Sequence, residues 1–182
     1  MQTEFTEGFV GVRRHQPGDV QPLFTAIYES IKELSPWLPW CHADYAIEET
    51  TAYLSTRDAE WEKGAEYDFA IFDARDGTFV GGVGLNRINQ RDKVANLGYW
   101  VRTGCARRGI ASAAALLAAK FAFQELGFNR LEIIAAVGNS ASRRVAEKIG
   151  AKQEGILRKR VMLHGMAHDA VLYSLVAEDL KP

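Results

Sequence analysis

The spacing of apolar residues predicts two helices after a short first strand. Residues 9–13 alternate weakly between apolar and polar, as expected of a strand. Asp19 then precedes apolar residues at helical spacing, which predicts a capped helix through Val20, Leu23, Ile27 and Ile31. Residues 48–62 predict a second helix, whose other positions are mainly charged.

The middle of the chain predicts three consecutive strands. They cover residues 67–72, 79–88 and 94–101, and short polar turns separate them. Such short connections favour an antiparallel meander. A helix follows, with Ile110, Ala114, Leu117 and Phe121 on its apolar face and Gly127 as its end.

The last third of the chain predicts a buried strand, a helix and two final strands. Residues 131–137 form the buried strand, and Asn139 or Ser140 can cap a helix that runs to Gly150. The final strands cover residues 151–163 and 170–176, around a turn at Gly165.

This order of elements predicts one mixed α+β domain over residues 1–182. The strand at 94–101, the following helix and the strand at 131–137 should form a right-handed parallel unit within an otherwise antiparallel sheet. Ligands favour the carboxyl edge of such a unit.

Composition narrows the class of protein. A formal net charge of −1 lacks the electrostatic footprint of a protein that coats nucleic acid. Two cysteines, Cys41 and Cys105, cannot form a disulfide framework, so a reducing, cytoplasmic location fits best. The N-terminus does not resemble a signal peptide, and the most apolar stretch is too short to span a membrane. His164 and His168 have a metal-ligand spacing but lie around a predicted hairpin, so no metal is expected.

The turn at residues 102–109 carries the clearest chemical signal. It joins a strand to a helix and contains Gly104, Arg107, Arg108 and Gly109. Glycines let the backbone approach a ligand closely, and free N–H groups at a helix start attract an anion such as a pyrophosphate. The alternative is that both arginines are solvated charges before an ordinary helix, and the spacing alone does not decide between the two.

At this turn the sequence resembles the GNAT superfamily of N-acetyltransferases, whose acyl-coenzyme A loop is matched by residues 106–111. The family pattern begins with Gln or Arg, whereas this chain has Ala106. The resemblance therefore implies the backbone contacts of this loop with the pyrophosphate, but not a side-chain contact from its first position. The resemblance is closer to the ribosomal-protein N-terminal acetyltransferases of the RimJ/RimL type and extends over almost the whole chain. Its motifs occur in matching order at residues 34–40, 69–71, 80–85, 97–100, 139–150, 155–158 and 168–174.

The resemblance implies a three-layer α/β/α GNAT fold with a mostly antiparallel sheet of about seven strands. It also implies direct attack of an amine on acetyl-coenzyme A. Ser142 is the candidate acid for the leaving thiolate, although a serine there can equally be a capping residue. The residues implied in acyl-coenzyme A binding are Trp100, Val101, Arg102, Thr103, Arg107, Arg108, Gly109, Ile110, Ala111, Ser112 and Asn139.

The acceptor side is less determined. Trp37, Trp40 and Glu66 are candidates for substrate binding, and Glu66, Asp169 or water is the candidate base. Residues 102–160 hold 12 Lys and Arg against 4 Asp and Glu, whereas residues 44–68 hold 2 against 8. A basic half suits coenzyme A phosphates, and an acidic segment near tryptophans suits a cationic amine; both can also be ordinary surface.

We therefore expect an acetyl-coenzyme A-dependent N-acetyltransferase. The resemblance implies as substrate the α-amino group of a ribosomal or other protein. An α-amine, with a pKa near 8 against about 10.4 for lysine, can lose its proton to a weak base or to water, which also favours an N-terminal substrate. The alternatives are an acyltransferase for a small amine, a succinyl-coenzyme A user, and a non-catalytic acyl-coenzyme A-binding module. A homodimer through the last strands is also implied by the resemblance.

Overall fold

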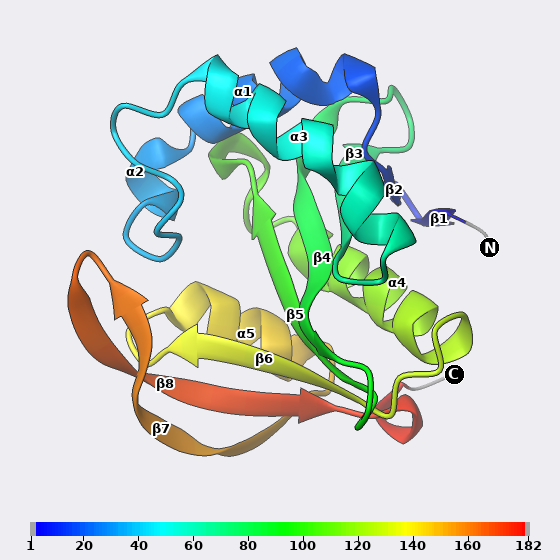
Figure 1. The fold of residues 1–182 in the computed structure, drawn as a ribbon, viewed down its shortest axis with the longest axis vertical. Helices are drawn as coiled ribbons and strands as arrows, with labels where there is room; N and C mark the ends of the chain where they lie inside the picture. The colour runs from blue at the N-terminus through cyan, green and yellow to red at the C-terminus, as the bar shows by residue number, and fades with distance from the viewer. Residues whose placement is uncertain (1–2, 181–182) are drawn as a thin grey trace.

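The computed structural model describes residues 3–180, which form one eight-stranded sheet with helices on both faces (Figure 1). The strand order is β1-β2-β3-β4-β5-β6-β8-β7. The strands are Glu4–Glu7 (β1), Val10–Arg14 (β2), Tyr67–Asp73 (β3), Phe79–Asn89 (β4), Val94–Val101 (β5), Arg130–Ala136 (β6), Lys152–Leu163 (β7) and Met166–Leu175 (β8). The α-helices are Val20–Tyr28 (α1), Ile31–Leu34 (α2), Ile47–Glu62 (α3), Ile110–Gln124 (α4) and Ser140–Lys148 (α5).

The predicted α+β class and antiparallel meander are confirmed. β3, β4 and β5 pair antiparallel in succession, and β5 and β6 form the parallel pair around α4. The sheet has eight strands, whereas the sequence predicted about seven; the additional strand is β1. β1 has four residues, lies at the sheet edge and is mostly exposed, so it carries no buried alternation.

Two further boundaries differ from the prediction. The first helix ends at Tyr28, and α2 follows after a break at Ser30. Ser30 is buried, and its Oγ accepts a hydrogen bond from the Thr103 backbone N–H at 2.9 Å, which ties this break to the end of β5. β8 begins at Met166, whereas the sequence predicted a start at residue 170. The prediction missed the first four residues because none of them is buried and they show no apolar periodicity.

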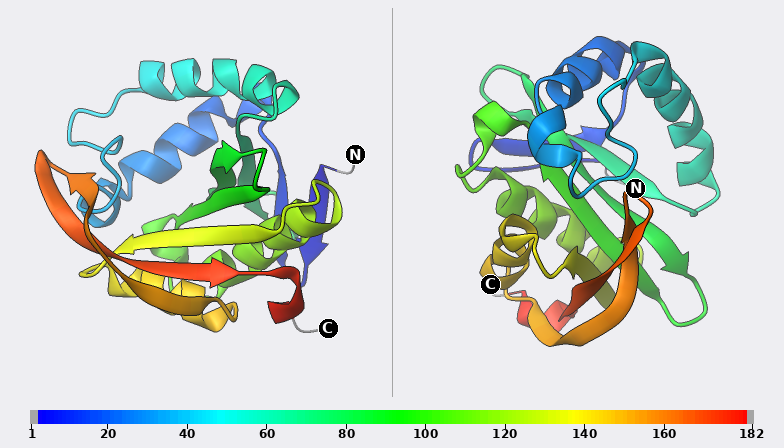
Figure 2. Two further views of the ribbon diagram at one scale, coloured as in Figure 1. Left: turned by 60° about the horizontal axis from the view of Figure 1, so that its bottom comes forward. Right: turned by 90° about the vertical axis from the view of Figure 1, so that its left-hand side faces the viewer.

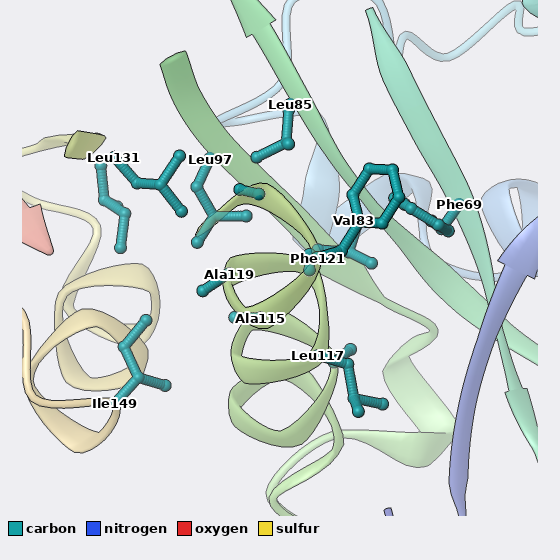
Figure 3. Close-up of a cluster of buried hydrophobic side chains, with 14 of the residues drawn as sticks. Phe69, Val83, Leu85, Leu97, Ala115, Leu117, Ala119, Phe121, Leu131 and Ile149 are labelled. Atoms are coloured by element: carbon teal, nitrogen blue, oxygen red, sulfur yellow. The ribbon is translucent and has the colours of Figure 1, made fainter. Parts of the chain in front are cut away.

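Helices cover both faces of the sheet (Figure 2), and one apolar cluster lies on each face. Strand residues such as Phe69, Leu85 and Leu97 face α4, where they pack around Phe121 and the alanines of that helix (Figure 3). On the other face, α1 packs Leu23 and Ile27 against the sheet. Because successive strand residues point to opposite faces, the same strands serve both clusters.

The parallel pair β5–β6 is short, and the two strands then diverge. Their register covers only Val94, Ala95 and Asn96 of β5 against Arg130, Leu131 and Glu132 of β6. Beyond these pairs β5 continues along β4 to Val101, while β6 continues along β8 to Ala136. Figure 1 shows the two strands leaving a common origin in different directions. The inner edges of both strands are therefore left without a sheet partner.

Candidate active site

The divergence of β5 and β6 opens a cleft of about 1500 Å³. Its walls come from both faces of the sheet: α4 and α5 on one, and the segment between α1 and α3 on the other. The predicted site residues that line it are Trp37, Trp40, Glu66, Trp100, Val101, Thr103, Arg107, Gly109, Ile110, Ala111, Ser112, Asn139 and Ser142.

Backbone N–H groups of β5 point into the opening. The Arg102 N–H donates to the Val80 carbonyl on β4 at 2.9 Å, and alternate residues of a strand bond to opposite neighbours. The N–H groups of Tyr99 and Val101 therefore face the side that β6 has left, whereas the N–H of Trp100 faces β4. Unpaired donors in this position suit a carbonyl oxygen that gains negative charge.

The turn before α4 adopts an anion-binding conformation. Gly109 is the N-cap residue with φ +81°, and Arg107 also has a positive φ, +62°. The first backbone bond of the helix runs from the Ala113 N–H to the Gly109 carbonyl, and no side chain caps the helix start. The N–H groups of the first turn, at Ile110, Ala111 and Ser112, thus have no intrahelical partner and sit at the positive end of the helix dipole.

Cationic side chains surround this turn, but two of the predicted ones lie elsewhere. Arg107 lines the cleft. Arg102 instead donates to Glu29 at 2.7 Å, and Arg108 is exposed, with its guanidinium 5.6 Å from the ring centroid of Phe9. Neither Arg102 nor Arg108 is among the residues that line the cleft.

Helix α5 supplies two cations that the sequence reading did not single out. Arg144 and Lys148 follow Ser140 at intervals of four residues, so they share one helix face, and all three line the cleft. The Lys148 Nζ lies 3.5 Å from the position of a Cβ built on Gly109. Their i, i+4 spacing on a predicted helix could have indicated from the sequence that they share one face. Together with Arg107 they provide charge for a phosphate group bound at the helix start.

Asn139 and Ser142 occupy the start of α5 beside Tyr99. The Asn139 Oδ1 accepts from the Ser142 N–H at 3.0 Å, so Asn139, one of the two predicted caps, is the observed N-cap. The Tyr99 hydroxyl donates to the Ser142 carbonyl at 2.8 Å, and the Ser142 hydroxyl donates to the Tyr99 oxygen at 3.4 Å. Burial, opposed by this contact with Ser142, raises the pKa of Tyr99 to about 12, so Tyr99 stays protonated at neutral pH.

The opposite end of the cleft is aromatic and acidic. The rings of Trp40 and Trp100 meet edge to face, with centroids 6.2 Å apart. The Arg57 Nη1 donates to both Glu66 and Asp68 at 2.5 Å, and both carboxylates line the cleft. The sequence reading missed Asp68, because its proximity to the cleft depends on the pairing of β3 with β4.

Asp169, the other candidate base, lies in a neighbouring pocket of about 600 Å³. Its Oδ1 accepts from the Lys159 backbone N–H at 2.9 Å. His164 and His168 line the same pocket. Within residues 3–180, no group of three or more His, Cys, Asp or Glu side chains is placed to hold a metal ion, and no helix is both long and apolar enough to cross a membrane.

Comparison with known proteins agrees with this geometry. The family described as "Acetyltransferase (GNAT) domain" matches residues 10–152. A protein of Bacillus subtilis (strain 168) named "Putative ribosomal N-acetyltransferase YdaF" is 32% identical over 174 residues, which cover 93% of this chain and 92% of that protein. The "Ribosomal-protein-serine acetyltransferase" of Escherichia coli (strain K12) is 26% identical over 159 residues, 87% of this chain and 88% of that protein.

A solved structure shares the fold over nearly the same extent. "Mycobacterium smegmatis RimJ in complex with CoA-disulfide" superimposes with a TM-score of 0.87 at 27% identity and covers 95% of this chain and 84% of that chain. A family match over most of the chain, a relative above 30% identity and the split parallel strands agree with one another. The chain belongs to the GNAT family of acetyltransferases.

Proposed function

We propose that this acetyltransferase moves the acetyl group of acetyl-coenzyme A to the N-terminal α-amino group of a ribosomal protein. The names of relatives support this choice of acceptor, since proteins similar along most of the chain are called ribosomal or ribosomal-protein acetyltransferases. The proposal includes direct attack by the amine, without an acyl-enzyme.

The observation that carries the proposal is the cleft that passes between β5 and β6. Basic groups and the bare helix start lie on the α4–α5 face, and the aromatic and acidic residues lie on the α1–α3 face. A phosphate-bearing donor and a cationic acceptor can therefore enter from opposite faces and meet at the unpaired edge of β5. Holding both reactants in one cleft removes the need for a covalent enzyme intermediate.

The residues of the α4–α5 face fit acetyl-coenzyme A. The first-turn N–H groups of α4, with Arg107 and Lys148, suit the pyrophosphate, and the open edges of β5 and β6 leave backbone groups for the amide chain. Asn139 has its amide nitrogen available for the same chain, because its Oδ1 is used by the helix cap. Acetyl-coenzyme A supplies an acyl group already activated as a thioester.

Three tasks then fall to the protein. The N–H groups of Tyr99 and Val101 stabilise charge that develops on the carbonyl oxygen. The Ser142 hydroxyl donates to the departing thiolate, and Tyr99 holds that serine through its carbonyl and its hydroxyl. On the acceptor face the ammonium loses a proton to a carboxylate or to water, and Glu66 is the candidate named from sequence that lies in the cleft.

The proposal keeps two further expectations, a cytoplasmic location and a homodimer formed through the last strands. Exposed apolar side chains on β7 and β8 support the second, with Ile156, Met162 and Met166 between 57% and 63% exposed. Light scattering of the purified protein would give a mass of two chains if the dimer forms, and of one chain if it does not.

Mass spectrometry of an acetylation reaction tests the function. The purified protein is incubated with acetyl-coenzyme A and ribosomal proteins that have free N-termini, and modified peptides are sequenced. We expect one added acetyl group on an α-amine. A matched peptide whose α-amine is blocked but which keeps a lysine is the control. Acetylation of lysine alone, or of small amines alone, would overturn the proposal.

A further inference from the structure

Three glycines, Gly82 and Gly84 on β4 and Gly98 on β5, lie on the acceptor face of the sheet. The register places Gly82 opposite Trp100, and Gly84 between Asp68 and Gly98. All of these residues line the cleft. Asp68, Gly84 and Gly98 are paired in succession, so this row crosses the sheet from β3 to β5, with neighbouring strands about 4.8 Å apart. The far edge of β5 at this point has no sheet partner.

Two of these glycines are covered by neighbouring side chains, and the third is not. A Cβ on Gly82 would lie 2.7 Å from the Trp100 indole nitrogen, and a Cβ on Gly84 would overlap the Asp68 carboxylate. A Cβ on Gly98 would have no neighbour nearer than 3.9 Å, where it meets the amide nitrogens of Asn86 and Asn96. The result is a small gap above Gly98, which is the one of the three glycines that lies on β5.

The walls of this gap match the start of a peptide chain. The Asp68 carboxylate lies over Gly84, the cross-strand partner of Gly98, where it attracts an ammonium group. The amide nitrogens of Asn86 and Asn96 are donors for a carbonyl oxygen; that of Asn96 already donates one N–H to the Asn86 Oδ1 at 3.0 Å and keeps its second. An α-amino group is followed by a carbonyl within one residue, whereas a simple alkylamine is not. Trp100 lies two residues along β5 on the same face of the sheet and covers Gly82, and its aromatic surface also favours a cation.

The net charge around Asp68 favours the binding of one added cation. Asp68 and Glu66 share the single guanidinium of Arg57, so the three groups carry a net negative charge when both acids are ionised. His15 and Tyr53 also line this end of the cleft. Burial raises the pKa of Asp68 above its ordinary value and Arg57 opposes that change, so a second cation would favour the ionised form.

We propose that the gap above Gly98 is the subsite for the first residue of the acceptor, with the Asp68 carboxylate as the group that binds its ammonium. Asp68 then takes one proton from the bound ammonium: an N–H bond breaks and an O–H bond forms. The electron pair left on nitrogen forms the C–N bond to the acetyl carbonyl, the C–S bond breaks, and the thiolate leaves with the proton that Ser142 donates. The second proton on nitrogen passes to water, and Ser142 regains its proton from water. This subsite rests on the proposed function and specifies its acceptor chemistry as a peptide with a small first residue.

Gly98→Ala fills the gap without disturbing the fold, because the added methyl has open space and Gly98 does not have a positive φ. Gly155→Ala is the matched control: it lies on β7, has nothing within 4 Å of its Cβ position, and is outside the cleft. Both variants should keep the wild-type melting temperature or exceed it slightly, since alanine is favoured over glycine in a strand. Both should also keep the wild-type affinity for acetyl-coenzyme A.

The readout is the KM for two synthetic peptides that differ only in their first residue, serine or glycine. Gly98→Ala should raise the KM of the serine peptide about tenfold, equivalent to about 1.4 kcal/mol. It should raise the KM of the glycine peptide less, because glycine leaves room for the new methyl. Gly155→Ala should change neither value, and equal KM values for Gly98→Ala and wild type would overturn the subsite.

Asp68→Asn tests the carboxylate separately. It should raise the KM of both peptides and reduce kcat, while the affinity for acetyl-coenzyme A stays at the wild-type value. Unchanged KM and kcat would overturn the role of Asp68. If the wild-type protein transfers acetyl to neither peptide, the proposed function fails and the subsite with it. If the wild type is active and both Gly98→Ala and Asp68→Asn have its KM and kcat, the subsite alone fails.

Discussion

Replacing Asn139 by alanine and by aspartate separates its two roles at the start of α5. Its Oδ1 accepts the Ser142 N–H at 3.0 Å, and its side chain also lines the cleft. Loss of such an N-cap costs about 1 kcal/mol, which for a chain of this size lowers the melting temperature by roughly 2–4 °C. Asn139→Ala should therefore melt lower and bind acetyl-coenzyme A more weakly.

Asn139→Asp keeps an oxygen acceptor and places a negative charge at a helix N-terminus, so its stability should match or exceed that of the wild type. It removes the amide N–H donors that we assign to acetyl-coenzyme A. One lost hydrogen bond is worth about 0.5–1.5 kcal/mol, or roughly a 2- to 13-fold weaker Kd. Melting curves and calorimetric titration give both quantities. An unchanged melting temperature for Asn139→Ala would refute the cap, and an unchanged Kd for Asn139→Asp would refute the ligand contact.

Three further substitutions address the leaving group, the helix start and the acid stability of the fold. Ser142→Ala should lower kcat by about 10²- to 10⁴-fold without changing the Kd of acetyl-coenzyme A, and an unchanged kcat would remove Ser142 from the mechanism. Gly109→Ala forces a side chain to φ +81°, so it should lose about 1–2 kcal/mol of stability and weaken acetyl-coenzyme A binding; wild-type values for both would contradict the loop assignment. Burial of Asp19 opposes its ionisation, but the hydrogen bonds from Arg13, His15 and the Gln16 backbone N–H together outweigh this and hold the Asp19 pKa well below its ordinary value. Asp19→Asn should therefore lower the free energy of unfolding by about 3–5 kcal/mol at neutral pH, and its difference from the wild type should narrow as the pH falls below about 4. Urea unfolding measures this difference, and a difference that does not change with pH would contradict the reasoning.

The fold could be predicted where local pattern and final environment agree. The prediction for β5 was correct at both ends, because residues 94–101 have polar turns on both sides. The parallel unit followed from the order of a strand, an alanine-rich helix and a buried strand. β1 could not be found this way, since an exposed edge strand is held by pairing with β2 rather than by burial.

The site could be predicted only in part, because sequence does not show which of several similar groups face the cleft. Arg102, Arg107 and Arg108 look alike in the chain, yet the positive φ of Arg107 and the ion pair of Arg102 with Glu29 give them different surroundings. The neighbourhood of Asp68 and Gly98 depends on the register of three strands. Such a register is set by the folded sheet and cannot be read from either residue alone.

Thermal unfolding with acetyl-coenzyme A tests most directly the claim that the split between β5 and β6 is the donor site. A ligand at about 100 times its Kd adds roughly 2.7 kcal/mol of stability, which predicts a rise in melting temperature of roughly 5–11 °C. ATP at the same concentration is the control, because it offers phosphates without the thioester arm. A rise with acetyl-coenzyme A that Gly109→Ala reduces is the predicted result. No rise, or an equal rise with ATP, would contradict it.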